Sequence, residues 1–95
     1  NDRYLERLVE TFFKPLFERG EVFIKEGLAQ GHFTKKVDPR QFLLTIYAMT
    51  MGYFSDADFV AKLMEDEDPL DGKVLRARKE HLLEMIFSSL GCKRP

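Results

Sequence analysis

The sequence predicts an all-α fold of three long antiparallel helices. Apolar residues recur every three to four positions through most of the chain, which is the spacing of one helix face. Two Asp-Pro steps are typical of helix starts, and no stretch alternates as a strand does. The predicted helices span about 2–30, 38–65 and 69–91.

The first predicted helix, over 2–30, is kinked at Pro15 rather than interrupted there. Proline lacks a backbone N–H and therefore kinks or ends a helix. The apolar stripe nevertheless keeps its phase across Pro15, since Phe12 and Leu16 lie one turn apart. Because a loop would reset this phase, the pattern favours one kinked helix over two helices joined by a loop.

Three glycines shape the end and the apolar side of this helix. Gly20 and Gly27 lie on the apolar side, where the missing side chain predicts the close approach of another backbone. Gly31 predicts the left-handed residue that commonly follows a helix.

The second predicted helix begins with Asp38 as cap and Pro39 at its first position. Placing its residues at 100° intervals produces two apolar stripes, and a helix with two apolar faces must be covered on both. One stripe holds Phe42, Ile46, Met49, Tyr53, Val60 and Met64, and the other holds Leu43, Leu44, Tyr47, Met51 and Phe54.

The third predicted helix has the same kind of start, with Asp68 as cap and Pro69 at the first position. Gly91 ends it. Its apolar stripe holds Leu75, Leu82, Leu83, Met85, Ile86 and Leu90.

Wide apolar faces on two helices predict self-association. If they were left in water they would exceed the apolar patch usual for a monomer, whereas two copies can bury them in a four-helix interface about a two-fold axis. The alternative is that the stripes form the core of a monomer, and that Arg78 is a solvated charge rather than an interface ion pair. The predicted homodimer interface consists of Phe42, Ile46, Met49, Tyr53, Arg78, Leu82, Met85 and Ile86.

Composition excludes several classes of protein. Fifteen basic and 16 acidic residues give a net charge of -1, so nothing favours direct binding of nucleic acid. The longest apolar stretch is shorter than the ~20 residues of a membrane helix, so no membrane partner is expected. A single cysteine and the absence of a signal peptide favour a reduced, cytoplasmic setting.

Neither catalysis nor metal binding has support in the sequence, and no cofactor is expected. There is no Ser-His-Asp neighbourhood and no phosphate-binding loop, which favours a protein that is not an enzyme. His32 and His81 lack further ligands at metal-binding spacing. The acidic run 65–68 lacks the order of a calcium loop, and Cys92 is interpreted as an incidental exposed thiol.

The order of these features resembles the C-terminal domain of TetR-family transcriptional regulators. The resemblance rests on Gln-Gly-His-Phe at 30–33, Val-Asp-Pro-Arg-Gln-Phe at 37–42 and a long apolar helix with the internal glycine Gly52. It covers nearly the whole chain. Within that family the sequence most resembles the pyrimidine-utilisation repressor branch, whose middle helix carries an aromatic residue at the position of Tyr47.

This resemblance implies a dimeric repressor in which an N-terminal helix-turn-helix reads operator DNA and a C-terminal domain binds a small-molecule effector. Effector binding would change the spacing of the DNA-reading heads and release the operator. No helix-turn-helix precedes Asn1, so we expect 1–95 to be a single C-terminal domain that meets DNA only through a part outside it. The family pocket also uses helices absent here.

Five residues are the candidates for the effector pocket that the resemblance implies. Such a pocket is mostly apolar with a few polar groups, so we expect an apolar or aromatic effector. Tyr47 supplies a hydroxyl and Met51 an adaptable wall, although a stripe of this kind also forms ordinary core. The candidates are Phe13, Phe17, Tyr47, Met51 and Phe54.

A second interpretation is a stand-alone helical module whose open apolar face receives the helix of another protein. A third, a small hydrolase or lipid-handling enzyme, would require turnover that depends on Tyr47 or His81. The regulatory domain remains the favoured hypothesis.

Overall fold

The computed structural model describes residues 2–94, which form helices and connecting turns with no strand. The helical elements are α1 (Asp2–Leu8), the π-helical segment η1 (Val9–Phe13), α2 (Lys14–Ala29), α3 (Pro39–Ser55), α4 (Ala57–Leu63) and α5 (Gly72–Leu90). The predicted all-α fold is confirmed. None of these helices is long and apolar enough to cross a membrane.

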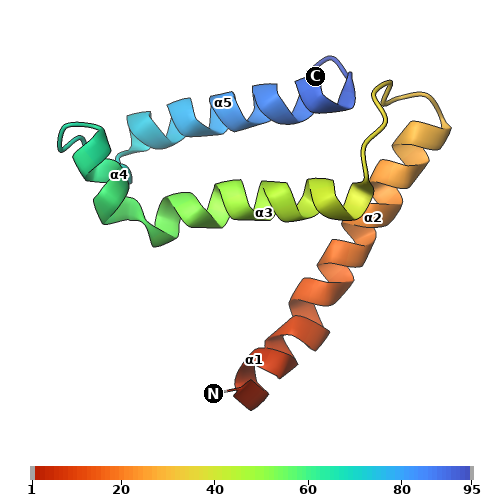
Figure 1. The fold of residues 1–95 in the computed structure, drawn as a ribbon, viewed down its shortest axis with the longest axis horizontal. Coiled ribbons are helices and arrows are strands. Elements are labelled where there is room, and N and C mark those ends of the chain that lie inside the picture. Colours follow the sequence, from red (N-terminus) through yellow and green to blue (C-terminus); the bar gives the residue numbers. More distant parts are fainter. Residues whose placement is uncertain (1, 95) are drawn as a thin grey trace.

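Two parts make up the architecture, which we call the layer and the arm (Figure 1). In the layer, α3 and α5 lie side by side and run in opposite directions, with the short α4 joining them at one end. The arm consists of α1, η1 and α2 in one continuous helical run, and it crosses the other end of α3 instead of running alongside it. Only α3 and α5 are therefore long antiparallel neighbours.

The arm stays helical through Pro15, as predicted, and the irregularity lies just before the proline. The Lys14 N–H donates to the carbonyl oxygen of Val9, five residues back, as in a π-helix. Pro15 has no N–H to donate to the preceding turn. One wide turn thus accommodates the missing donor without a loop.

The second helix begins as predicted but is shorter than the predicted 38–65. The Asp38 carboxylate accepts the Arg40 and Gln41 N–H groups at 3.0 and 3.2 Å. The helix then breaks at Asp56, whose backbone (φ −107°, ψ 27°) leaves the helical region, and α4 follows in a new direction. Aspartate favours turns over helix interiors because its side chain competes for backbone groups.

The third helix starts later than predicted, at Gly72 instead of 69. Its cap is Asp71, which accepts the Lys73 N–H at 3.1 Å. Asp68, the predicted cap, instead accepts the Leu70 N–H within the turn before the helix. Gly31 is left-handed as predicted, with φ +79°, and Gly91, which ends α5 as predicted, is also left-handed, with φ +67°.

A small core lies where the turn after α2 meets the end of α5. Its buried apolar side chains are Ile24, Phe33 and Leu90. The Leu90 carbonyl oxygen accepts the N–H groups of Thr34 and Lys35 at 2.9 and 3.1 Å. This turn therefore caps the carbonyl end of α5.

The two glycines of the arm face side chains, not the backbone that was predicted. Gly20 faces the Leu43 side chain of α3, and Gly27 faces the ring of Phe33. Because a methyl group at Gly27 would overlap that ring, Phe33 can lie in the core only opposite a glycine.

The molecule is flatter and more open than a compact domain of its length. Its principal dimensions are 44 × 40 × 18 Å and its radius of gyration is 16.0 Å, against about 12 Å for a compact chain of this size. Much apolar surface is left for a partner to cover.

Candidate functional site

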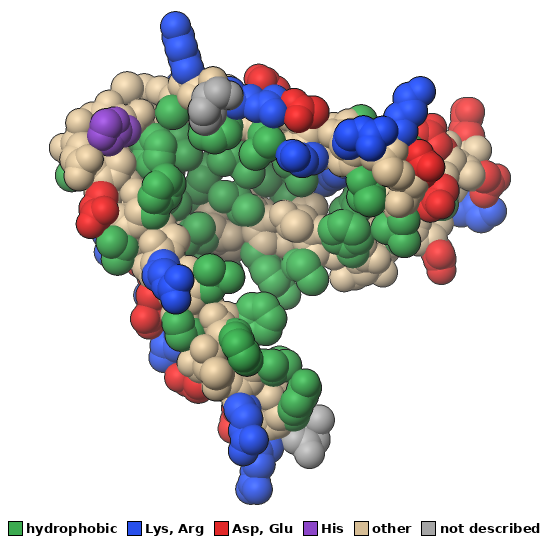
Figure 2. All heavy atoms as spheres, turned by 180° about the vertical axis from the view of Figure 1, so that it is seen from behind, with side chains coloured by type: hydrophobic (Ala, Val, Ile, Leu, Met, Phe, Trp, Pro, Cys, Tyr) green, Lys and Arg blue, Asp and Glu red, His purple; other side chains and the backbone are tan. Residues whose placement is uncertain are grey.

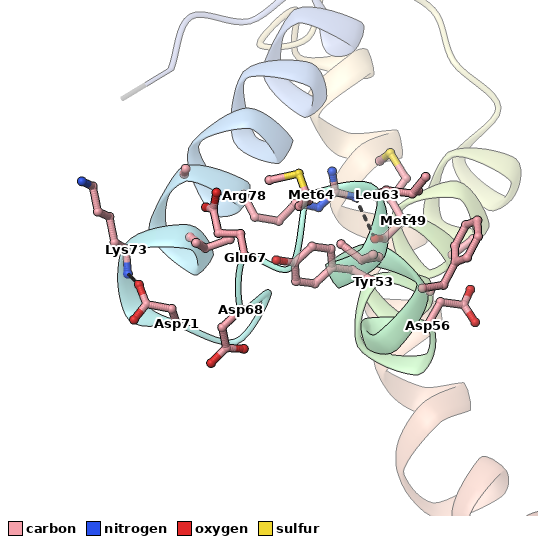
Figure 3. Close-up of a pocket in the computed structure, with 16 residues that line it drawn as sticks. Met49, Tyr53, Asp56, Leu63, Met64, Glu67, Asp68, Asp71, Lys73 and Arg78 are labelled. Atoms are coloured by element: carbon pink, nitrogen blue, oxygen red, sulfur yellow. Dashed lines mark hydrogen bonds between the residues drawn. The ribbon is translucent and has the colours of Figure 1, made fainter.

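The largest hollow lies at the α4 end of the layer, where α3, α4 and α5 meet (Figure 3). Its volume is about 1120 Å³, which is large enough for a small molecule or for part of another helix. Its apolar lining comes from all three helices: Ala48, Met49, Phe59, Val60, Leu63, Met64, Val74 and Ala77.

Tyr53 and Arg78 join the walls of this hollow to each other. The Tyr53 hydroxyl donates to the Pro69 carbonyl oxygen at 2.6 Å, which ties α3 to the turn before α5. The Arg78 guanidinium lies 5.1 Å from the centre of the Tyr53 ring, and its Nη2 donates to the Met49 carbonyl oxygen at 3.2 Å. In Figure 3 these side chains lie together between α3 and α5.

Arg78 is an unusual residue for a helix surface. Its Nε is buried and has no hydrogen-bond acceptor among the described residues. The described chain also shows no carboxylate paired with its guanidinium; the ring of Tyr53 and one carbonyl oxygen hold the charge instead. The alternative of a fully solvated surface charge is therefore wrong.

The rim of the hollow is acidic. Asp56, Glu67, Asp68 and Asp71 all line it, with Lys73 as the one further cation besides Arg78 among the residues that line it. The Asp68 and Asp71 carboxylates accept backbone N–H groups, whereas those of Asp56 and Glu67 make no hydrogen bond or ion pair within residues 2–94. These two carboxylates are free to meet a positively charged partner.

The eight residues predicted for the dimer interface line the seam between α3 and α5 within one chain. Residues of both helices line a hollow of about 240 Å³ that shares Met49 with the larger one. Tyr53, Arg78 and Leu82 line another, of about 300 Å³. The other predicted interface residues, Phe42, Ile46, Met85 and Ile86, line the hollow of about 240 Å³ together with Met49.

The five residues predicted for the effector pocket lie on the arm and on α3. Phe13 is 54% exposed and Tyr47 is 60% exposed, so neither is ordinary core in this chain. Met51 and Phe54 are also exposed, whereas Phe17 is half-buried with the Arg40 guanidinium 5.7 Å from its ring centre. Figure 2 shows apolar side chains along the inner side of the angle between arm and layer.

The contribution of α4 to the hollow did not follow from the helix periodicity. Phe59 and Leu63 are 65% and 67% exposed, and both line the large hollow. A continuous helix would have kept them in line with α3. The Ser-Asp pair at 55–56 was the available sign of the break.

The histidines and the cysteine form no evident site. His32 Nε2 lies 3.1 Å from the Gln30 side-chain oxygen, and His81 is exposed on α5. No group of three or more potential metal ligands occurs among residues 2–94. The Cys92 thiol contacts the Lys93 carbonyl oxygen and is half-buried, not exposed as predicted.

Comparison with known proteins adds one finding. The sequence model of a family described as "Tetracyclin repressor-like, C-terminal domain" matches residues 2–86, which include α1 to α4 and most of α5. No curated protein and no solved structure matches the chain.

Proposed function

The chain belongs to the tetracyclin repressor-like C-terminal domains, and from this we propose that it dimerises and binds a small-molecule effector within a transcriptional repressor. Membership in the family makes it the regulatory domain of a transcriptional regulator, and such domains belong to regulatory proteins rather than to enzymes. Operator DNA would be contacted by a helix-turn-helix domain outside these 95 residues. The branch of pyrimidine-utilisation repressors stays a prediction.

The observation that carries this proposal is the apolar surface left open. Seventeen large hydrophobic side chains are exposed in the described chain, against three that are buried. Soluble monomers rarely leave extended apolar patches in water, because removing apolar surface from water is favourable by roughly 25 cal/mol for each Å² buried. A regulatory domain that meets a second copy and an effector accounts for both exposed regions, the layer and the inner side of the arm.

We assign dimerisation to the layer. Its two long helices present Phe42, Ile46, Met49 and Tyr53 from α3 and Arg78, Leu82, Met85 and Ile86 from α5. A partner laid on this seam would complete a four-helix interface about a two-fold axis.

Light scattering over a dilution series tests the dimer. We expect a molar mass near twice 11.1 kDa that stays constant until high dilution. Met85→Asp should give a folded monomer, since this side chain is 43% exposed and its loss leaves the core intact. Leu82→Asp and Ile86→Asp should act likewise, and circular dichroism would verify that they fold. Leu5→Asp, on the arm, is the matched control that should remain dimeric.

A folded monomer at every concentration would reject the dimer. It would favour the alternative of a stand-alone helical module that receives the helix of a different protein.

We assign effector binding to the inner side of the arm and the exposed stripe of α3. Phe13, Phe17, Tyr47, Met51 and Phe54 offer aromatic and thioether surface with one hydroxyl, which suits an apolar or aromatic ligand. The ligand would release the operator by changing how the two arms of the dimer are spaced.

An aromatic probe, 1-anilinonaphthalene-8-sulfonate, tests this assignment through its fluorescence. Met51 and Met64 are both 45% exposed, so they form a matched pair. Met51→Lys should weaken binding of the probe more than Met64→Lys does, because Met64 lies outside the proposed site and lines the hollow at the α4 end. Equal effects of the two substitutions would contradict the assignment.

A further inference from the structure

The short helix α4 carries the most exposed apolar side chains of the layer. Phe59 and Leu63 are 65% and 67% exposed, and both line the hollow at the α4 end together with Met64. Asp56, Phe59 and Leu63 follow one another at three and four positions, which places them on one face of a helix. None of these four residues belongs to the interface that we assign to the dimer.

This hollow is open rather than enclosed. Small-molecule sites bury roughly 70–90% of their ligand between their walls, whereas Phe59 and Leu63 form a wall that stands mostly in water. A volume of about 1120 Å³ between three helices matches a broader, convex surface. The apolar stripe of a helix has that shape, and helices commonly dock into apolar grooves in this way.

The rim of the hollow is acidic and only partly compensated. Residues 56–73 contain seven carboxylates and two lysines. The exposed carboxylates of Asp56 and Glu67, which precede and follow α4, make no hydrogen bond or ion pair within residues 2–94. Figure 3 shows them on opposite sides of Tyr53. Arg78 does not neutralise them, because its guanidinium lies against the Tyr53 ring and forms no ion pair in the described chain.

The turn after α4 is held in place by its own bonds. Glu65 and Asp66 have left-handed backbone, with φ of +56° and +66°. The Asp66 N–H donates to the Ala61 carbonyl oxygen at 2.7 Å, and the Lys62 ammonium donates to the Asp66 carboxylate at 2.7 Å. Glu67 is therefore positioned at the rim before any partner arrives, which reduces the cost of ordering the site on binding.

We propose that this hollow receives an amphipathic helix of another protein, with large apolar side chains on one face and lysine or arginine beside them. The apolar face would cover Phe59, Leu63 and Met64, and the basic side chains would lie against Asp56 and Glu67. This inference does not rest on the proposed dimer or on effector binding, since its apolar contacts lie outside both of those surfaces.

Three synthetic helices test the chemistry of this partner. The probe is a labelled peptide of leucine and lysine, about 14 residues or four turns long, with all leucines on one face. A second peptide has glutamate in place of lysine, and a third has the composition of the first with its leucines dispersed around the helix. Fluorescence anisotropy with the 95-residue chain measures each dissociation constant. We expect the first peptide to bind at least about tenfold more tightly than the others, and equal binding of all three would overturn the proposal.

A matched pair of substitutions tests the place of binding. Phe59→Ser should weaken binding of the leucine-lysine peptide by at least about tenfold, because it removes an apolar contact. Phe12→Ser, on the arm, should leave the dissociation constant unchanged. The two side chains are 65% and 64% exposed, so both variants should fold. Equal losses from the two substitutions would overturn the assignment to α4.

The role of the rim is tested by removing its charge without changing its shape. Asp56→Asn with Glu67→Gln should weaken binding by about tenfold at about 50 mM NaCl and have little effect at about 500 mM, where charges are screened. The Asp56 side chain makes no capping bond to α4, so this variant should fold. Glu6→Gln with Glu18→Gln is the control on the arm and should have no effect. Full affinity after loss of the rim charges would contradict the choice of a basic helix.

Met85→Asp separates this site from the dimer. Met85 does not line the hollow, so the variant should bind the leucine-lysine peptide as tightly as the unmodified chain does. Binding by Met85→Asp alone would show that a second copy already covers the hollow, and the proposal would fail while the dimer stands. A chain that is monomeric at every concentration would reject the dimer, and peptide binding that depends on Phe59 would still support this site.

Discussion

The Tyr53 hydroxyl and the Pro69 carbonyl oxygen form a 2.6 Å hydrogen bond that spans 16 residues and joins α3 to the turn before α5. Pro69 is buried, so its carbonyl oxygen has little access to water as an alternative donor. The ring of the same tyrosine supports the Arg78 guanidinium. One side chain therefore holds the turn and orients the cation in the wall of the largest hollow.

Replacing Tyr53 by phenylalanine should destabilise the fold. The substitution keeps the ring under Arg78 but leaves the buried Pro69 oxygen without its donor, which costs about 1–2 kcal/mol. Urea unfolding followed by circular dichroism measures the free energy of unfolding. Tyr47→Phe is the control, because Tyr47 is 60% exposed and its change should stay within about 0.5 kcal/mol. Equal effects of both substitutions would contradict this role of Tyr53.

Gly27→Ala should destabilise the chain even though alanine favours helix. The added methyl would overlap the Phe33 ring, and displacing that ring from the core costs about 1–3 kcal/mol. Gly52→Ala meets open space and should instead stabilise the monomer by up to about 1 kcal/mol. Thermal unfolding at a dilution where the chain is monomeric compares the two. If both alanine substitutions raised the unfolding temperature, the Phe33 ring would not be what requires a glycine at position 27.

Asp38→Ala should weaken the start of α3 by about 1 kcal/mol, because one carboxylate oxygen accepts two backbone N–H groups there. Asp38→Asn keeps an acceptor in the same place and should lose far less. Amide hydrogen exchange of Arg40 and Gln41 provides the local measurement. Protection of these two amides that is unchanged in the alanine variant would argue against the cap.

The pair of Glu80 and Arg94 should make the C-terminal segment sensitive to acid. The hydrogen bond from Arg94 holds the pKa of Glu80 below its ordinary value of 4.5. A carboxyl group with a lowered pKa contributes stability above its unfolded pKa and loses it as pH falls through the folded value. The pair's contribution to holding this segment on α5 should therefore be lost as the pH falls through the lowered pKa of Glu80.

An NMR titration of the Glu80 carboxyl group checks this pair directly. In Arg94→Gln the pKa of Glu80 should rise toward 4.5. Lys93→Gln removes a neighbouring charge but not the hydrogen bond, so it should leave the pKa of Glu80 lowered. A pKa of Glu80 that does not change in Arg94→Gln would contradict the pairing.

Helix starts were predictable from the sequence only where a single signal was present. Asp38-Pro39 has no competitor nearby, and the structure begins α3 there. Asp68 and Asp71 are both capable caps three residues apart, and Pro69 favours the first. The tertiary bond from Tyr53 instead places Pro69 in the turn, so the helix starts after Asp71. Local propensity cannot anticipate a partner 16 residues away.

The break at Asp56 was concealed by periodicity. Val60 and Met64 continue the stripe of α3 in phase, so the pattern alone favours one helix. The chain then turns through Glu65 and Asp66, whose φ angles are +56° and +66°. Left-handed backbone at residues other than glycine is uncommon, and composition offers no sign of it.

For the site, the apolar stripes of α3 and α5 indicated which residues are covered. They did not indicate whether the covering residues come from the same chain or from a second copy. Phe42, Met49 and Met85 lie together along one seam, as a shared interface requires. A stripe records only that a face is covered and does not distinguish a neighbour in the same chain from one in a second copy.

The continuous arm of α1, η1 and α2 acts mechanically as a lever. At 1.5 Å per residue its 28 residues extend for about 40 Å, and its base is held at the layer by Gly20 against Leu43. From that contact to the amino-terminal tip the arm extends for about 27 Å, so a rotation of about ten degrees at Gly20 displaces the tip by about 5 Å. If the proposed effector tilts the arm near this fulcrum, the tilt would be amplified into a displacement of several ångströms at the amino-terminal tip.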